Sequence, residues 1–180
     1  MSEAVARLAE QARQLRNDFD AGFAEAARGD DAVLADLLTL RAEGEPYALR
    51  LAEIAGLFAD RKITPLPGGR AGLLGCAVFR GSIAPVYDLH ALLGHAAAAP
   101  PHWLALAAQA PVAFAFEAFE GHRSVRQGAI LPREAGDFSR PFIRDFVSEG
   151  QEGWPLVHLP SVLAALGERR ARRNLGSQED

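Results

Sequence analysis

The feature that most constrains the fold is an internal repeat. Residues 155–163 (PLVHLPSVL) resemble residues 85–93 (PVYDLHALL), because in both a proline-led apolar strand leads into a short leucine-rich helix. A hairpin pattern precedes each unit in its half of the chain, at residues 37–51 and again at residues 103–116. Repetition of this kind predicts two similar small barrels. Each half has only about 65 residues, a size at which an isolated core is marginal, so we expect the halves to pack together with a groove between them.

The segments within each half are typical of β-structure. From Leu37 onward, short apolar runs are separated by glycine, proline and acidic turn residues, as in small barrels. Residues 73–79 and 82–87 flank Arg80 and Gly81, which predicts a hairpin with glycine in its turn. The stretch from Asp88 to Gly94 predicts one short helix, capped by the aspartate and ended by the glycine.

The two ends of the chain differ from this middle part. Residues 1–31 carry apolar side chains at helical spacing, which predicts an amphipathic helix followed by a turn. The stripe consists of Val5, Leu8, Ala12, Leu15, Phe19 and Phe23. Such a helix either packs on its own domain or serves docking or self-association. Residues 32–167 then form the domain, with the two barrels split near 95–101, and residues 168–180 form a polar tail.

Composition excludes several classes of protein. A net charge of −4 gives no electrostatic reason to expect nucleic acid or an anionic membrane as partner. The single cysteine, Cys76, excludes an internal disulfide and a thiolate metal cluster. No apolar stretch is long enough to span a membrane, and the N-terminus lacks the pattern of a signal peptide. We therefore expect a cytoplasmic protein without direct membrane insertion.

Nothing in the sequence predicts catalysis. The five histidines include no helical pair with an acidic partner, as a zinc hydrolase would have. Asp88 and His90 are close in sequence, but at a helix start they point in different directions. The glycine-rich stretch 68–72 lacks the lysine and hydroxyl residue of a phosphate-binding loop. We expect no enzyme, no cofactor and no metal.

Arg80 is the one charged residue that the pattern singles out. Its place on a tight turn between two apolar strands fixes its backbone and directs its guanidinium to one place. Two interpretations remain open: a salt bridge across the barrel, and contact with a partner protein.

Residues 75–89 (GCAVFRGSIAPVYDL) resemble the signature of CheW-like domains, a Gly-Val-x-Asn-Leu-Arg-Gly-x-x-x-Pro-Val-x-Asp-Leu run. The resemblance extends upstream through Tyr47 and Ile54 to Leu37, and more weakly downstream to Leu166. It implies a mainly β fold, with two intertwined five-stranded barrels of SH3-like type and short helices. This expectation agrees with the internal repeat.

The resemblance also implies a function in binding. CheW-like proteins join the cytoplasmic tip of methyl-accepting chemoreceptors to the regulatory domain of the histidine kinase CheA, with the receptor helix in the groove between barrels. No enzymatic activity and no cofactor are implied, and the location would be cytoplasmic, at receptor arrays. Matched residue by residue, the receptor-facing positions are Ile54, Gly75 and Arg80. Recognition would then be of the helix-in-groove kind.

The sequence also departs from the family pattern in ways that bear on the choice of partner. Val78 replaces an asparagine, and Gly56 stands where many relatives carry an acidic residue. His158 and Glu117 each replace an aspartate. The departures leave a second interpretation open: an accessory CheW-like paralogue that binds the receptor or another CheW-like domain, but not the kinase, and modulates array assembly. A third class, a β-barrel module for ligands or nucleic acid, is disfavoured because the tyrosines and tryptophans are scattered.

Overall fold

The structure is a computed structural model, and it divides into two compact units, residues 1–33 and 34–180. It describes residues 33–42, 44–67, 72–95, 100–133, 140–149 and 152–176. The predicted N-terminal amphipathic helix lies outside the described residues and stays a prediction. All of the described strands and helices belong to the second unit.

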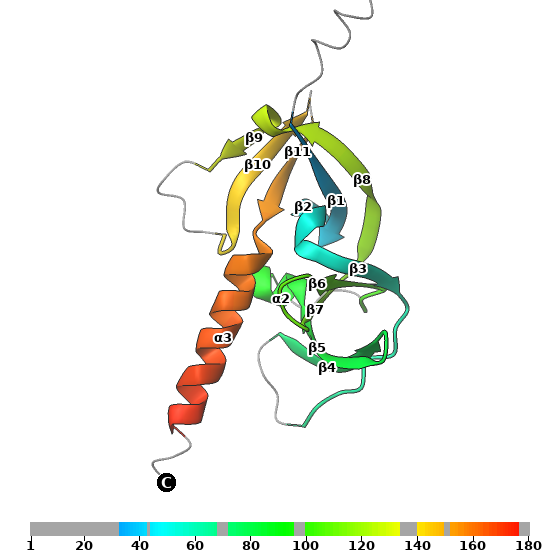
Figure 1. The fold of residues 1–180 in the computed structure, drawn as a ribbon, viewed down its shortest axis with the longest axis vertical. Helices are drawn as coiled ribbons and strands as arrows, with labels where there is room; N and C mark the ends of the chain where they lie inside the picture. Colours follow the sequence, from blue (N-terminus) through cyan, green and yellow to red (C-terminus); the bar gives the residue numbers. More distant parts are fainter. Residues whose placement is uncertain are drawn as a thin grey trace, which may run out of the picture. The chain divides into compact units, whose positions relative to one another are not determined.

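The second unit consists mainly of strands in two sheets (Figure 1). The six-stranded sheet has the order β8-β1-β2-β11-β10-β9. Its strands are β1 (Leu34–Ala42), β2 (Glu45–Arg50), β8 (Ala118–Arg126), β9 (Ile130–Pro132), β10 (Ile143–Glu149) and β11 (Glu152–Val157). The five-stranded sheet has the order β3-β6-β7-β5-β4. Its strands are β3 (Ile54–Ala59), β4 (Leu73–Phe79), β5 (Ser82–Asp88), β6 (Trp103–Ala107) and β7 (Ala113–Phe116).

The two sheets have the same strand order once β9 is set aside, which confirms the internal repeat. Each half contributes its first hairpin to the other half's sheet: β1 and β2 join the strands that follow residue 118, and β6 and β7 join β3, β4 and β5. The sheets are therefore intertwined. In each sheet, one parallel strand pair joins the exchanged hairpin to the strands of the other half. Val86 of β5 pairs with Ala113 of β7, and Leu156 of β11 pairs with Ala48 of β2.

This exchange corrects part of the prediction. Residues 95–101 do not separate the two sheets, because each sheet takes strands from both sides of that connector. The first sheet also has a sixth strand, β9, that the sequence did not suggest. Closure of each sheet into an SH3-like barrel is not part of the strand pairings and stays a prediction.

The largest core cluster lies where the two sheets and the helices meet. Its fully buried members include Tyr47 and Leu49 from one sheet, Phe114 from the other, and Leu89 and Val162 from the helices. Each sheet also has an apolar cluster of its own. The halves thus share a core, as expected for two units too small to be stable separately.

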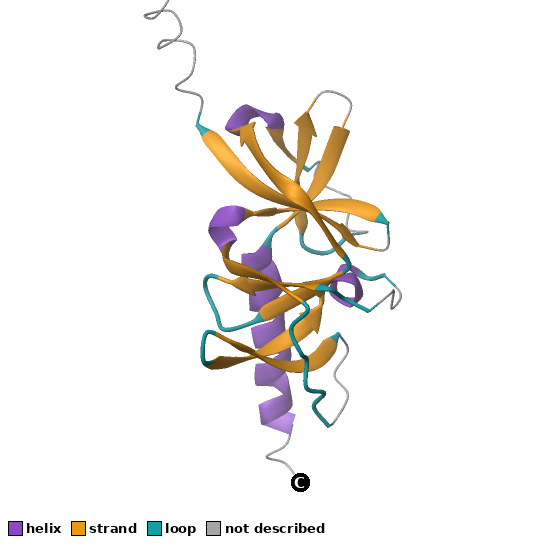
Figure 2. Ribbon diagram, turned by 90° about the vertical axis from the view of Figure 1, so that its right-hand side faces the viewer, coloured by secondary structure: helices purple, strands orange, loops and turns teal. Residues whose placement is uncertain are grey.

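Helical segments complete the unit: η1 (Leu51–Glu53), α2 (Leu89–Leu93), η2 (Gln127–Ala129) and α3 (Leu159–Gly176). Helix α2 is capped by Asp88 and ends at Gly94, as predicted. Helix α3, the long helix in Figure 2, continues through residues that the sequence assigned to a tail beginning at Glu168. Arginine, alanine and glutamate favour helix, which agrees with the helical structure of this polar segment. Among the described residues, no helix combines the length and hydrophobicity needed to cross a membrane.

Candidate partner-binding surface

The turn between β4 and β5 presents Arg80 at the surface. Phe79 and Ser82 pair across the hairpin, and both turn residues have left-handed backbones, with φ of 47° at Arg80 and 85° at Gly81. This is the geometry of a tight two-residue hairpin turn, for which glycine at the second position is well suited. The predicted hairpin is confirmed. Arg80 is exposed.

The guanidinium of Arg80 lies beside strand β3, which is at the other end of the strand order of this sheet. A Cβ atom built on Gly56 would lie 3.6 Å from Nη2 of Arg80 and 3.0 Å from the ring of Phe58. The missing side chain at Gly56 therefore leaves room for the arginine. Within the described residues, Arg80 forms no ion pair or hydrogen bond, so the salt bridge across the barrel is not observed.

A shallow cleft of about 380 Å³ begins at Arg80 and extends to the β6–β7 turn. Its lining is small and mostly apolar: Phe79, Arg80, Ser82, Ala84, Leu106, Ala107, Ala108, Gln109, Ala110 and Pro111. Ile54 begins β3 and lies opposite Ala107 of this lining. Its half-buried side chain packs against the main core. Two of the three predicted positions, Ile54 and Arg80, thus lie at the same region of the five-stranded sheet.

Gly75 has a different environment from the other two predicted positions. It is buried on β4 with φ of 151°, and a Cβ atom there would lie 2.2 Å from the carbonyl oxygen of Thr64. The chain passes this close because Thr64 and Cys76 exchange two backbone hydrogen bonds of 2.8 and 2.9 Å. Gly75 is not part of the cleft lining. Its role in this structure is to let residues 63–65 pack on β4.

A second surface was missed by the sequence analysis. Val78 and Ile83 face each other across the hairpin and are 55% and 71% exposed. Together with Leu66 they border a groove of about 480 Å³ whose lining includes Arg61 and Lys62 and no acidic residue. The signal was the alternation along β4 and β5, which directs these two apolar side chains to the outer face. Exposed apolar clusters with a polar rim are typical of protein interfaces.

A cluster of catalytic residue types on β1 and β8 is not arranged for catalysis. The hydroxyl of Ser124 donates to Asp36 at 2.5 Å, and the ring of His122 lies 3.2 Å from the same carboxylate oxygen. The serine hydrogen bond, with a smaller contribution from His122, holds the pKa of Asp36 below its ordinary value. Serine and histidine both contact the aspartate instead of each other, so the serine–histidine–aspartate order of a catalytic triad is not formed. No described group of three or more potential ligands is placed to hold a metal.

Comparison with known proteins identifies the fold and the family. The family model for the CheW-like domain matches residues 36–167, well over half of the chain. The chain belongs to the CheW-like domain family. It is thus a CheW-like protein, of a family of chemotaxis scaffold proteins.

A solved structure agrees with this assignment. The protein is similar to the scaffolding protein TtCheW from Thermoanaerobacter tengcongensis, with a TM-score of 0.64, 15% identity, and coverage of 70% of this chain and 90% of that one. At this identity the likeness concerns the fold. No curated protein matches the sequence.

Proposed function

We propose that this CheW-like protein is a non-enzymatic adaptor that links methyl-accepting chemoreceptors to a CheA-type histidine kinase, in the cytoplasm at receptor arrays. The observation that carries the proposal is Arg80, a guanidinium held on a rigid turn with no charged partner among the described residues. A cation fixed in this way is suited to recognition, because little side-chain and backbone freedom is lost when a partner binds.

The receptor would bind along β3 and the cleft beside Arg80. The small side chains of Ala107, Ala108 and Ala110 let another backbone approach closely. A receptor helix would place apolar side chains against Ile54 and this lining, with a polar or acidic side chain at Arg80. Gly75 contributes to this surface only through the fold of β4.

The kinase would bind at the apolar surface of Val78, Ile83 and Leu66. This surface lies on the same hairpin as Arg80, and its exposed aliphatic side chains are suited to packing against another β-domain. An adaptor needs two separate surfaces, and the five-stranded sheet offers a charged one and an apolar one.

The alternative function is that of an accessory paralogue, which binds the receptor or another CheW-like domain but not the kinase. Val78 favours it, because the family pattern has asparagine there and the change to valine enlarges the exposed apolar surface. A surface altered in this way could prefer a different CheW-like partner.

Calorimetric titration tests the proposal with a receptor tip fragment and, separately, with the CheA regulatory domain. We expect Arg80→Ala to weaken receptor binding about tenfold or more and to leave kinase binding unchanged. Ile83→Ser should weaken kinase binding and leave receptor binding unchanged. Ile83 is exposed, so a loss of binding in this variant would not be due to misfolding. Arg126→Ala, an exposed arginine on β8, is the control for loss of charge alone.

The outcomes separate the interpretations. Binding of both partners, each weakened by its own variant, supports the adaptor. Receptor binding without kinase binding favours the accessory paralogue. Binding of neither, or equal effects of Arg80→Ala and Arg126→Ala, contradicts the assigned surfaces.

A further inference from the structure

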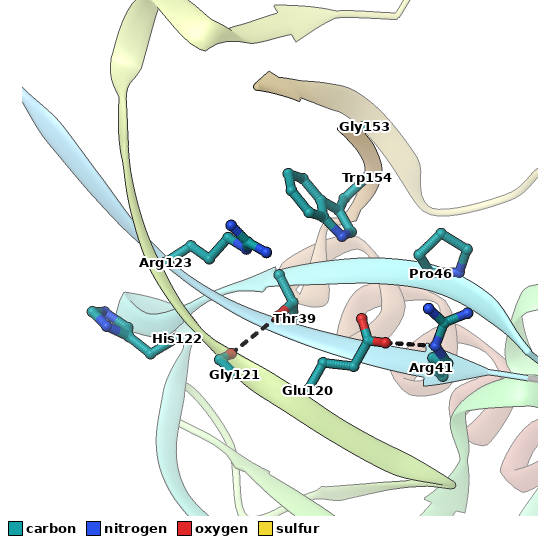
Figure 3. A pocket seen from close by; sticks show the side chains of 9 residues that line it. All are labelled: Thr39, Arg41, Pro46, Glu120, Gly121, His122, Arg123, Gly153 and Trp154. Atoms are coloured by element: carbon teal, nitrogen blue, oxygen red, sulfur yellow. Dashed lines mark hydrogen bonds and ion pairs between the residues drawn. The ribbon is translucent and has the colours of Figure 1, made fainter. Parts of the chain in front are cut away.

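The six-stranded sheet contains a cleft of about 510 Å³, on different strands from the Arg80 cleft and the apolar groove. Its walls come from β1, β2, β8 and β11, and Figure 3 shows the nine residues that line it. They are Thr39, Arg41, Pro46, Glu120, Gly121, His122, Arg123, Gly153 and Trp154. The volume is in the range of sites for small ligands.

Trp154 is the unusual member of this lining. Its side chain belongs to the apolar cluster of this sheet, and the residue is only 5% exposed. Figure 3 shows its indole nitrogen turned toward the space between Arg123 and the Arg41–Glu120 pair. Within the described residues, the indole N–H has no hydrogen-bond partner. The nitrogen is not one of the buried atoms that lack a partner, so it is open to the cleft and can donate to a molecule bound there.

The charged groups around the cleft are also donors. Arg41 uses Nε for Glu120 and Nη1 for the carbonyl oxygen of Gly44, which leaves Nη2 without a described partner. Arg123 lies 4.8 Å above the Trp154 ring and adds a second positive charge. Glu120 is neutralised by Arg41. The hydroxyl of Thr39 donates to the carbonyl oxygen of Gly121 at 3.2 Å. Arg123 also lies 3.8 Å from the carboxylate of Glu149, so both cations have an acidic neighbour. The lining itself still holds more N–H donors than acceptors.

We propose that this cleft binds a carboxylate, which accepts hydrogen bonds from the indole N–H of Trp154 and from Nη2 of Arg41. A carboxylate has two acceptor oxygens, so it can take both donors at once, and charge-assisted bonds of this kind are the stronger ones. The carboxylate belongs either to a small organic acid or to an acidic side chain of a partner protein. The site is independent of receptor and kinase binding.

Nuclear magnetic resonance of the full chain tests this directly, since the chain has two tryptophans and thus two indole N–H signals. Trp103→Phe assigns them, and the Trp103 signal of the native protein is the internal control. The probes are succinate, for a small acid, and a blocked Gly-Glu-Gly peptide, for a side chain. Succinamide and the Gly-Gln-Gly peptide are their uncharged controls.

We expect a saturable downfield shift of the Trp154 indole proton with one carboxylate probe and not with its amide control. Arg41→Gln should weaken this binding about tenfold, while Arg126→Gln, in the same sheet but outside the lining, should not. A response to succinate assigns a small acid, and a response to the peptide alone assigns a partner side chain. The proposal is overturned if neither probe shifts the Trp154 signal, if both indole signals respond alike, or if Arg41→Gln and Arg126→Gln bind equally. The native titration does not depend on the folding of any variant.

Discussion

The two strand-to-helix units, β5 with α2 and β11 with α3, begin alike and end differently. Both start with a strand whose fourth residue is proline, Pro85 in β5 and Pro155 in β11. Both strands pair in parallel with a strand from the other half. Helix α2 ends after five residues at Gly94, whose φ is 89°, whereas α3 runs for 18 residues. The residue at the corresponding place in α3 is Ala164. Glycine favours a helix end in this left-handed conformation and alanine favours continuation, so this position contributes to the difference in length.

The two helices also differ in how their first turns are satisfied. In α2, a carboxylate oxygen of Asp88 accepts the N–H of His90 at 2.9 Å. Before α3, the ring of His158 accepts the N–H of Ser161 at 3.2 Å, and a carboxylate oxygen of Glu53 accepts the N–H of Leu159 at 3.0 Å. The second half thus takes its helix-capping carboxylate from the first half. This explains the histidine at position 158, because a second carboxylate beside Glu53 would repel it.

The largest effect is expected where the halves differ in a buried backbone contact. Gly75 lies opposite Val86, and Asp145 lies at the equivalent place opposite Leu156. Gly75→Ala should destabilise the fold by about 3 kcal/mol or more, since the new Cβ would overlap the carbonyl group of Thr64. Chemical denaturation followed by circular dichroism measures it.

Asp145→Ala is the matched change in the other half. It removes an ion pair with Arg50 of 3.0 Å between partly buried side chains, for which we expect about 1 kcal/mol. If Gly75→Ala and Asp145→Ala lowered the free energy of unfolding equally, residues 63–65 would not pack on β4 as described.

The exchange of caps is tested by placing aspartate in the second half. His158→Asp should destabilise the protein by about 1 kcal/mol, because two carboxylates would then share one helix start. In a Glu53→Gln background the same change should be harmless, since glutamine keeps an acceptor oxygen for Leu159 without the charge. A double-mutant cycle from thermal unfolding gives this coupling. Additive effects would mean that Glu53 and position 158 act separately.

The cause of the different helix lengths is tested by exchanging glycine and alanine at the two corresponding positions, 94 and 164. Gly94→Ala should cost about 1 kcal/mol, because alanine is strained at a φ of 89°. Ala164→Gly should cost about the same by weakening α3, and both positions are exposed, so loss of packing does not contribute. Far-ultraviolet circular dichroism should show lower helix content for the second variant alone. Unchanged helix content there would contradict the role given to position 164.

A smaller effect concerns pH. Burial raises the pKa of Glu53 above its ordinary value of 4.5, despite the opposing hydrogen bond from Leu159. The folded state therefore binds this proton more tightly than the unfolded state, and stability should fall as the pH rises above about 4.5. Glu53→Gln removes the group, so its stability should fall less over that pH range than that of the native protein. Identical pH profiles of the melting temperature would contradict the raised pKa.

Local signals predicted much of the fold. The hairpin of β4 and β5 and the limits of α2 follow from Gly81, Asp88 and Gly94, whose effects act within a few residues. The exchange of hairpins between halves could not be predicted in this way, because strand pairing depends on distant residues. Strand β8 was missed since its many polar residues conceal the few buried ones, such as Val125.

The candidate site shows the same limit. Arg80 was singled out because a turn fixes it locally. Two other features depend on contacts between residues far apart in the sequence, which local patterns do not predict. They are the position of Arg80 over Gly56 and the burial of Gly75 beneath Thr64. The apolar pair of Val78 and Ile83 was predictable in principle from alternation, once the strands were known to have one outer face.

The most direct test of the adaptor function is whether one molecule of this protein holds both partners at once. The receptor tip fragment and the CheA regulatory domain, mixed with and without the protein, can be separated by size-exclusion chromatography with light scattering. We expect a complex of all three that requires the protein and is lost with Arg80→Ala, while the complex of protein and kinase domain remains. Competition between the two partners, or a complex of all three that Arg80→Ala leaves intact, would contradict the proposed function.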